Sequence, residues 1–263
     1  MRSILFLLSL VLLGGCQTEK GTSVLQVDHV NIWIDEPAAG KKKLEALGFT
    51  AIPDSLCQVH QGQGTTGRYF YFLNAYLELI FINDREEFER NAQKNNALDF
   101  LERSNSPDNG FCPFGVALKV DGYDREKIPF DVVAYSQDWM GHGNNIYTAK
   151  NSKIKKEEPS IFVVYPEIEF DVFDSKDDLV NIPNQYAMWR QFYQHDNGVE
   201  KITKIKIHSH QLEETSQTVQ ALRQIGTVEL LEGEPYLMDL YFDDHRQNQS
   251  HDLRPVLPLR IFY

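Results

Sequence analysis

The sequence predicts an α+β fold, because a strand followed by a helix occurs near both ends of the chain. Residues 27–34 alternate between apolar and polar side chains, which is the period of a strand with one buried face. Residues 41–49 place leucines at helical spacing and contain a glycine stop. Residues 202–209 and 212–226 repeat this strand and helix. The strands that follow each helix then build the sheets.

The first strand divides its side chains between an apolar face and a polar, aromatic face. Val30 and Ile32 point to one side, while His29, Asn31 and Trp33 point to the other. An imidazole, an amide and an indole suit the lining of a cavity better than the core between a sheet and a helix. We therefore expect this face to line a cavity.

A glycine-rich loop and a hairpin follow the first helix. Residues 61–67 contain three glycines, which adopt backbone conformations closed to other residues. Residues 68–73 and 76–82 read as strands joined by a two-residue turn. In the second of these strands Glu78 points to the same side as Ile80, and a carboxylate among apolar neighbours needs a partner, a metal or a proton.

The amino terminus has the pattern of an export signal. A basic start precedes an apolar run at 4–13 that is too short for a stable membrane-spanning helix. Leu-Gly-Gly-Cys at 13–16 resembles the lipobox of bacterial lipoproteins, and an ordinary secretory cleavage site with an incidental cysteine is the alternative. The resemblance implies a signal peptide at 1–15 and a lipid on Cys16 that anchors the exported protein to a membrane of the cell envelope. Residues 16–24 then form a polar tether.

Charge and cysteine content restrict the partners of the exported chain. The formal charge of −12 becomes −13 when Arg2 leaves with the signal, because 38 acidic residues then face 25 basic ones. Such a balance disfavours nucleic acid and anionic lipid surfaces, whose binding depends on Lys and Arg. Cys57 and Cys112 either form a disulfide or remain as two small thiols, and the sequence leaves this pairing and the oligomeric state open.

Beyond the first module the sequence predicts a middle part and a final module. The boundaries are 25–103 for the first βαβββ module, 104–198 for middle strands with an irregular connection, and 199–263 for a final βαβββ-like module. Strands are expected at 115–120, 145–150, 160–170, 227–232, 236–242 and 256–263, and a charged surface helix, or two short ones, at 84–103.

The later strands lack the polar groups of the first module. Superposing the strands places Gly115 and Lys204 opposite His29, and Met238 opposite Glu78. In the irregular connection, Trp139 and His142 either reach into a cavity or lie at the surface. A His195-Asp-Asn-Gly turn introduces the final module, and a structural turn is the simpler interpretation of it.

Four short motifs in the first module resemble the glyoxalase-like domain family of the vicinal oxygen chelate superfamily. They are Asp-His-Val at 28–30, Leu-Glu-Ala-Leu-Gly-Phe at 44–49, His-Gln-Gly-Gln-Gly-Thr at 60–65 and Tyr-Leu-Glu-Leu-Ile at 76–80. The resemblance implies repeated βαβββ modules that form curled mixed sheets with helices on the outside. It also implies that His29 and Glu78 occupy the positions that hold one divalent metal, Zn, Mn, Fe or Ni, in the metal-using branches.

The candidate site therefore lies in the first module. His29, His60 and Glu78 are the candidate catalytic residues, because a histidine beside a carboxylate is a common acid–base arrangement. Residues around them are candidates for binding a substrate, namely Trp33, Thr65, Arg68, Tyr69 and Tyr71.

Three functions are open at this point. The first is an enzyme, of the lyase, isomerase or dioxygenase-like type, that acts on a small oxygen-rich metabolite with or without a metal. The second is a metal-free protein that binds or sequesters a small molecule without catalysis. In the third, His29 and Glu78 only hydrogen-bond within an inherited cavity.

Overall fold

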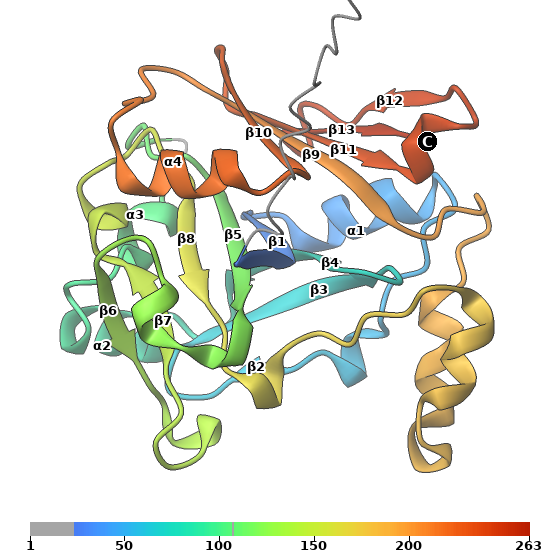
Figure 1. The fold of residues 1–263 in the computed structure, drawn as a ribbon, viewed down its shortest axis with the longest axis horizontal. Coiled ribbons are helices and arrows are strands. Elements are labelled where there is room, and N and C mark those ends of the chain that lie inside the picture. The colour runs from blue at the N-terminus through green and yellow to red at the C-terminus, as the bar shows by residue number, and fades with distance from the viewer. Residues whose placement is uncertain (1–23, 107) are drawn as a thin grey trace, which may run out of the picture.

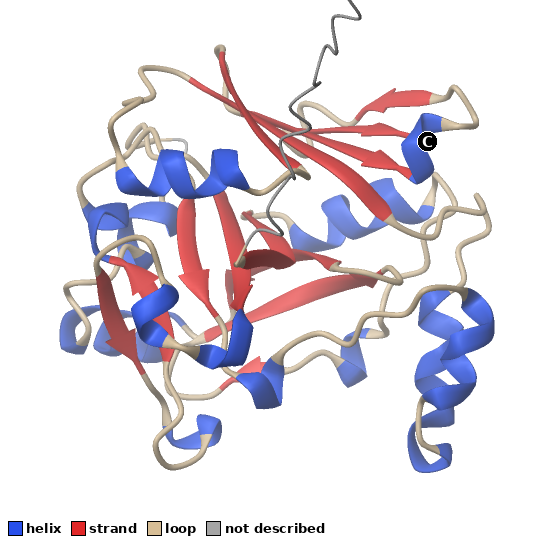
Figure 2. Cartoon of the chain, in the orientation of Figure 1, coloured by secondary structure: helices blue, strands red, loops and turns tan. Residues whose placement is uncertain are grey.

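Two sheets pack face to face in this protein (Figure 1). The computed structural model describes residues 24–106 and 108–263, so the expected signal peptide and Cys16 lie outside the described residues. Within these ranges helices and loops surround an eight-stranded and a five-stranded sheet, both of mixed strand direction (Figure 2). The expected α+β class with curled mixed sheets is thereby confirmed. No helix in the same ranges is long and apolar enough to cross a membrane.

The eight-stranded sheet has the strand order β2-β3-β4-β1-β5-β8-β7-β6. Its strands are β1 (Leu25–Trp33), β2 (Val59–His60), β3 (Thr65–Tyr71), β4 (Tyr76–Ile82), β5 (Phe114–Val120), β6 (Val132–Tyr135), β7 (Ile146–Ala149) and β8 (Ser160–Val163).

The strand pattern of this sheet is the same on both sides of its centre. β1 is parallel to β4 and antiparallel to β5, and β5 is parallel to β8. Strands β1–β4 form one half, with α1 (Pro37–Glu45) after β1, and β5–β8 form the other. In the second half two single helical turns, η2 (Asp121–Tyr123) and η3 (Arg125–Lys127), stand where the first half has α1. The middle of the chain, rather than the final module, therefore completes the curled sheet.

The final module forms the second sheet, with the order β10-β9-β11-β13-β12. Its elements are β9 (Ile202–Ser209), α4 (Gln217–Gln224), β10 (Val228–Glu232), β11 (Leu237–Phe242), β12 (Ser250–Asp252) and β13 (Leu259–Phe262). The helix is shorter than the expected 212–226, because the Glu232 carboxylate accepts the backbone N–H groups of Gln211 and Leu212 at 3.0 Å each and holds that segment in a turn.

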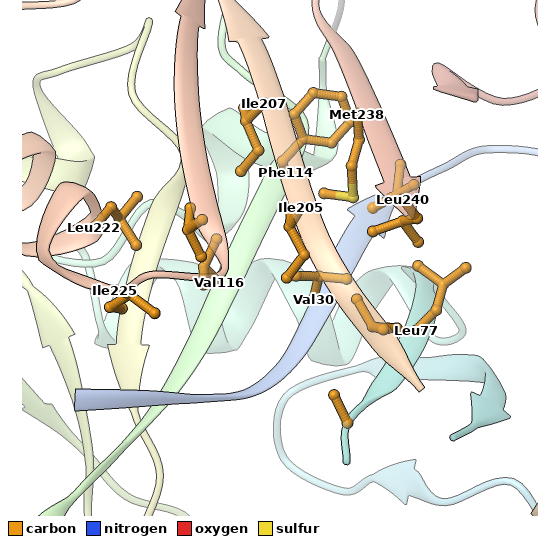
Figure 3. Packing of buried hydrophobic residues seen from close by; sticks show 14 of the residues in the cluster. Val30, Leu77, Phe114, Val116, Ile205, Ile207, Leu222, Ile225, Met238 and Leu240 are labelled. Atoms are coloured by element: carbon orange, nitrogen blue, oxygen red, sulfur yellow. The ribbon is translucent and has the colours of Figure 1, made fainter. Parts of the chain in front are cut away.

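The main hydrophobic core lies between the two sheets (Figure 3). Val30 and Val116 of the first sheet face Ile205 and Met238 of the second, and all four are at most 1% exposed. Successive strand residues point to opposite faces, so the neighbours of Val30 in β1 open on the far side of the first sheet. The two faces predicted for this strand are both present.

Several sequence-based expectations differ from the structure. Met238 is buried between the sheets, and Lys204 pairs with Glu229 at 3.5 Å, so neither is near His29 or Glu78. The strand expected at 160–170 ends at Val163. At 84–103, where one helix or two short ones were expected, the structure has two, α2 (Arg85–Lys94) and α3 (Phe100–Ser104).

Of the two arrangements left open for the cysteines, the structure has the unpaired one. Cys57 is partly buried and Cys112 is fully buried, and both are free thiols. Cys112 lies in the core between the sheets, where it packs as a small apolar side chain.

A buried arginine fastens α3 to the loops around β8. Arg103 is 1% exposed, and its Nε donates to Asp99 Oδ2 at 2.9 Å. Its guanidinium also donates to the carbonyl oxygens of Cys112, Ser152 and Glu158 at 2.7–2.8 Å. These bonds satisfy carbonyl groups that would otherwise be buried without a partner.

His195 connects the start of the final module with the first half of the sheet. Its Nδ1 accepts the Thr50 N–H at 2.9 Å, and its Nε2–H donates to the Tyr71 carbonyl at 2.9 Å. Burial lowers the pKa of His195 to about 4, so the imidazole is neutral at pH 7. The structural interpretation of this turn is the one that its contacts favour.

Candidate active site

A cavity of about 660 Å³ lies on the face of the first sheet that points away from the second sheet. Residues of β1, β3, β4, β7 and β8 form its floor, and residues from two connecting segments, 167–171 and 182–193, form part of its walls. The described lining residues all fall between His29 and Tyr193, so the final module contributes none of them.

His29 lines this cavity and is paired with Asp28, which is fully buried behind it. His29 Nδ1 lies 2.6 Å from Asp28 Oδ1, and Asp28 also accepts the Phe170 N–H and lies 3.5 Å from Lys119 Nζ. Burial by itself would raise the pKa of Asp28, but these three partners hold it below its usual value. Because an ionised Asp28 can only accept, Nδ1 of His29 is the donor, and a neutral His29 carries its lone pair on Nε2.

Glu78 faces this lone pair across the cavity floor. Its Oε2 lies 4.0 Å from His29 Nε2, and its Oε1, although buried, has no hydrogen-bond partner among the described residues. Gly67 on the neighbouring strand leaves room for the carboxylate, since a Cβ at this position would lie 2.6 Å from Glu78 Oε1. The His29 ring stacks on Tyr76 with centroids 4.1 Å apart, which fixes its orientation.

His60 lies in the same cavity but belongs to a separate hydrogen-bond network. Its Nδ1 lies 2.9 Å from Thr65 Oγ1, and its Nε2 lies 3.3 Å from the Tyr69 hydroxyl. Burial lowers the pKa of His60, partly offset by Glu78, so the ring is neutral at pH 7. Gln63 donates to the same Thr65 hydroxyl at 2.7 Å, so Thr65 positions His60 instead of lining the cavity.

Of the other residues expected to bind a substrate, Trp33, Tyr69 and Tyr71 line the cavity and Arg68 does not. Arg68 alternates with Tyr69 along β3 and therefore points to the other side, where it lies 3.1 Å from Asp54 and over the Phe81 ring. In this structure Arg68 therefore lies outside the cavity lining.

The phenols of the cavity remain protonated. Burial, reinforced by the Glu78 carboxylate, raises the pKa of Tyr69 and Tyr76 well above the usual value. Burial raises the pKa of Tyr71 to about 12. The Tyr71 and Tyr76 hydroxyls make no hydrogen bond with the described residues, so both are available as donors to a ligand.

Several lining residues were not predicted from the sequence. Asp28, which is fully buried behind His29 and does not line the cavity, was visible as its neighbour in the sequence. A regular strand places neighbours on opposite faces, and in β1 the register shifts between Val27 and His29, where the two side chains meet. Phe162, Trp189 and Tyr193 come from distant segments whose approach to β1 has no local signal. Trp139 lines the cavity, whereas His142 is exposed.

The symmetry of the first sheet identifies the residues of its second half that occupy the positions of His29 and Glu78. Tyr76 and Glu78 pair with His29 and Asn31, and Ser160 and Phe162 pair with Gly115 and Ala117 in the same way. With Gly115 in the place of His29, the counterpart of Glu78 is therefore Phe162, not Met238. The Phe162 ring contacts His29 edge-on with centroids 5.6 Å apart.

The donor set does not fit a catalytic metal. Mononuclear catalytic sites draw about three protein ligands, whereas only His29 and Glu78 converge here and His60 is turned toward Tyr69. In the described ranges no three His, Cys, Asp or Glu side chains are placed to hold one ion. Glu78 Oε1 is buried without a hydrogen-bond partner among the described residues, so a ligand that supplies a donor or a positive charge would satisfy it.

The chain is similar to one protein family in sequence pattern and to two solved structures. The pattern of the family described as "Glyoxalase-like domain" matches residues 27–223, while no curated protein matches the chain. A hypothetical protein from Staphylococcus aureus is similar in structure at 12% identity and a TM-score of 0.45, over 90% of this chain and 98% of that chain. A methylmalonyl-CoA epimerase from Mycobacterium tuberculosis is similar at 16% identity and a TM-score of 0.34, over 56% of this chain and 93% of that chain. Since the family pattern spans the whole curled sheet and continues into α4, the chain belongs to the glyoxalase-like domain family of the vicinal oxygen chelate superfamily.

Proposed function

We propose that this protein is a small-molecule enzyme in which His29, oriented by Asp28, transfers a proton on an oxygen-rich metabolite held in the cavity. The observation that carries this proposal is the 2.6 Å contact between Asp28 and His29 Nδ1, which leaves Nε2 as the basic atom, 4.0 Å from Glu78. The reaction class is that of an isomerase or lyase that starts by removing a proton next to a carbonyl group.

Each group has a defined task in such a reaction. His29 Nε2 accepts the proton, and the ionised Asp28 stabilises the imidazolium that results, an arrangement that contributes about 10²–10⁴-fold. The Tyr71 and Tyr76 hydroxyls donate to substrate oxygens on which negative charge develops. Glu78 lies beside His29 Nε2 on the cavity floor and holds a positive or protonated group of the substrate.

Exchange of carbon-bound hydrogen tests this proposal directly. The protein is incubated in D₂O with a pool of α-hydroxy and α-amino ketones, and mass spectrometry records molecules that gain one deuterium. We expect protein-dependent exchange that His29→Gln abolishes and that the matched control His142→Gln, at an exposed loop residue, leaves unchanged. Exchange that persists at the wild-type rate in His29→Gln contradicts the role of His29.

The alternative function is binding without catalysis. The observation that favours it is the aromatic lining, in which Tyr71 stacks on Trp189 and contacts Tyr193 with centroids 6.1 and 5.6 Å apart. Ligands of the pool that change tryptophan fluorescence without gaining deuterium would support this function, and Trp189→Phe would reduce the signal.

We further propose that the protein is exported and anchored by lipid on Cys16, which rests on the sequence pattern at 13–16. In bacterial cells that express the full chain, we expect the protein in the membrane fraction, with a mass increase on a peptide that begins at Cys16. Cys16→Ser should release it, whereas Cys57→Ser, which removes a thiol of the folded domain, should not. Membrane association of the Cys16→Ser protein equal to wild type contradicts the anchor.

A further inference from the structure

The cavity carries an unbalanced negative charge. Five carboxylates line it, at Glu78, Asp99, Glu167, Glu169 and Asp171, whereas none of the described lining residues is Lys or Arg. Among the described residues, Asp99 alone of the five has a Lys or Arg partner, Arg103, at 2.9 Å. The other four form no ion pair with a Lys or Arg of the described residues. Lys119, whose charge acts on Glu169, pairs with Asp28 and donates to the Phe170 carbonyl.

The charges are arranged from the rim to the floor. Glu167 lies in the helical turn η6 (Pro166–Ile168), and Glu169 and Asp171 follow it in the chain; all three are exposed or partly exposed and line the rim. Glu78 lies at the floor, 4% exposed, with Oε1 lacking any partner among the described residues. Burying a carboxylate without a positive partner is unfavourable, so a cationic group that reached Glu78 would stabilise it.

The walls between rim and floor are aromatic. Tyr76 and Phe170 have centroids 5.1 Å apart, and Tyr71 lies 5.0 Å from Phe170. Trp189 and Tyr193 continue this surface toward the opening. Ring faces attract organic cations and pack against apolar groups, whereas they offer no ligand atoms to a metal ion.

We propose that the ligand of this cavity is an organic cation, an amine or a quaternary ammonium with an apolar or aromatic body, whose positive group binds Glu78. The acidic rim attracts such a ligand and repels phosphorylated and carboxylated ones. This inference rests on the proposed function because it concerns the ligand of the same cavity. It adds that the metabolite carries a positive charge, while the hydroxyls of Tyr71 and Tyr76 bind its oxygens.

Three probes of similar shape and different charge test the proposal by calorimetry on the full folded chain: 2-phenylethylamine, 2-phenylethanol and 3-phenylpropionate. We expect the amine to bind at least about tenfold more tightly than the alcohol and the propionate not to bind at millimolar concentration. Glu78→Gln should reduce the amine to the affinity of the alcohol. The control Glu86→Gln, at an exposed helix residue 89% open to solvent, should leave all three unchanged.

Four outcomes overturn the proposal. They are equal affinity for amine and alcohol, tightest binding of the propionate, no binding of any probe, and stoichiometric Zn²⁺ binding that displaces the amine. The comparison of probes is made on the unaltered protein, so it decides even if Glu78→Gln fails to fold. Amine binding without deuterium exchange contradicts the proposed catalysis alone, and exchange restricted to neutral or anionic compounds contradicts the cation preference alone.

Discussion

Acidification should destabilise the fold through His195. The perturbation is a change from pH 7 to pH 5, compared between the wild type and His195→Gln. In the folded protein burial lowers the pKa of His195 from 6.5 to about 4, although the hydrogen bond to the Tyr71 carbonyl acts in the opposite direction. The unfolded chain therefore takes up the proton first as the pH falls. Stability that is present above about pH 6.5 is lost between about pH 6.5 and 4.

The magnitude follows from these two pKa values. Between about pH 6.5 and pH 4, protonation of His195 in the unfolded state lowers the free energy of unfolding by about 3 kcal/mol. About 2 kcal/mol of this decrease has occurred by pH 5. Urea unfolding of the wild type and of His195→Gln at both pH values measures the difference. His60, whose pKa is also lowered by burial, titrates in both proteins and cancels in the comparison.

Equal losses of unfolding free energy in the two proteins between pH 7 and pH 5 would refute the assignment of His195 as a buried neutral ring. A larger loss in the variant would refute it as well, since the variant has no imidazole at this position. The expected result is a wild-type loss that exceeds the loss of the variant by about 2 kcal/mol.

Three further substitutions have defined outcomes. Gly67→Ala places a Cβ 2.7 Å from the Tyr69 ring and closer still to Glu78. We therefore expect the free energy of unfolding in urea to fall by about 1–3 kcal/mol and amine binding to be lost. The control Gly226→Ala, where the new Cβ has no atom within 4 Å, should change neither quantity. Arg103→Met leaves Asp99 and several carbonyl groups without a donor, so we expect the free energy of unfolding to fall by about 3–5 kcal/mol. The control Arg85→Met, at an exposed residue, should lower it hardly at all. A similar effect of both substitutions would contradict the role of the buried guanidinium. Asp28→Asn should lower the free energy of unfolding at pH 7. Because the pKa of Asp28 is lowered, the wild type should lose this contribution of the carboxylate below about pH 4, and the variant should not. The same decrease of the unfolding free energy in acid for both proteins would contradict the role of Asp28.

The parts of the fold that depend on local pattern were predictable. The alternation in β1 placed His29 on a cavity face and Val30 in the core, and the helix stop at Gly48 and the hairpin before Glu78 follow from short-range rules. Each of these features is determined by residues only a few positions apart in the chain, so a single sequence is enough to predict it.

The parts that depend on distant pairing were not predictable. A sequence offset matched Met238 with Glu78, yet the sheet pairs β5 with β8, which makes Phe162 the counterpart. Asp28 needed the local shift in register of β1, and the aromatic walls needed the return of residues 182–193 to β3. The pairing of strands depends on the total area they bury together, and no local pattern encodes that sum.

The first sheet carries the lining residues and the second sheet only packs behind it, which affects how substitutions can change the site. β1 and β4 present reactive side chains on one face and are held from behind by a sheet that supplies no lining residue. The second sheet thus acts as a rigid support that keeps His29 and Glu78 at a fixed separation. Substitutions in the walls can alter ligand preference without weakening this support, whereas a cavity made at Met238 should loosen the His29–Glu78 geometry from a distance.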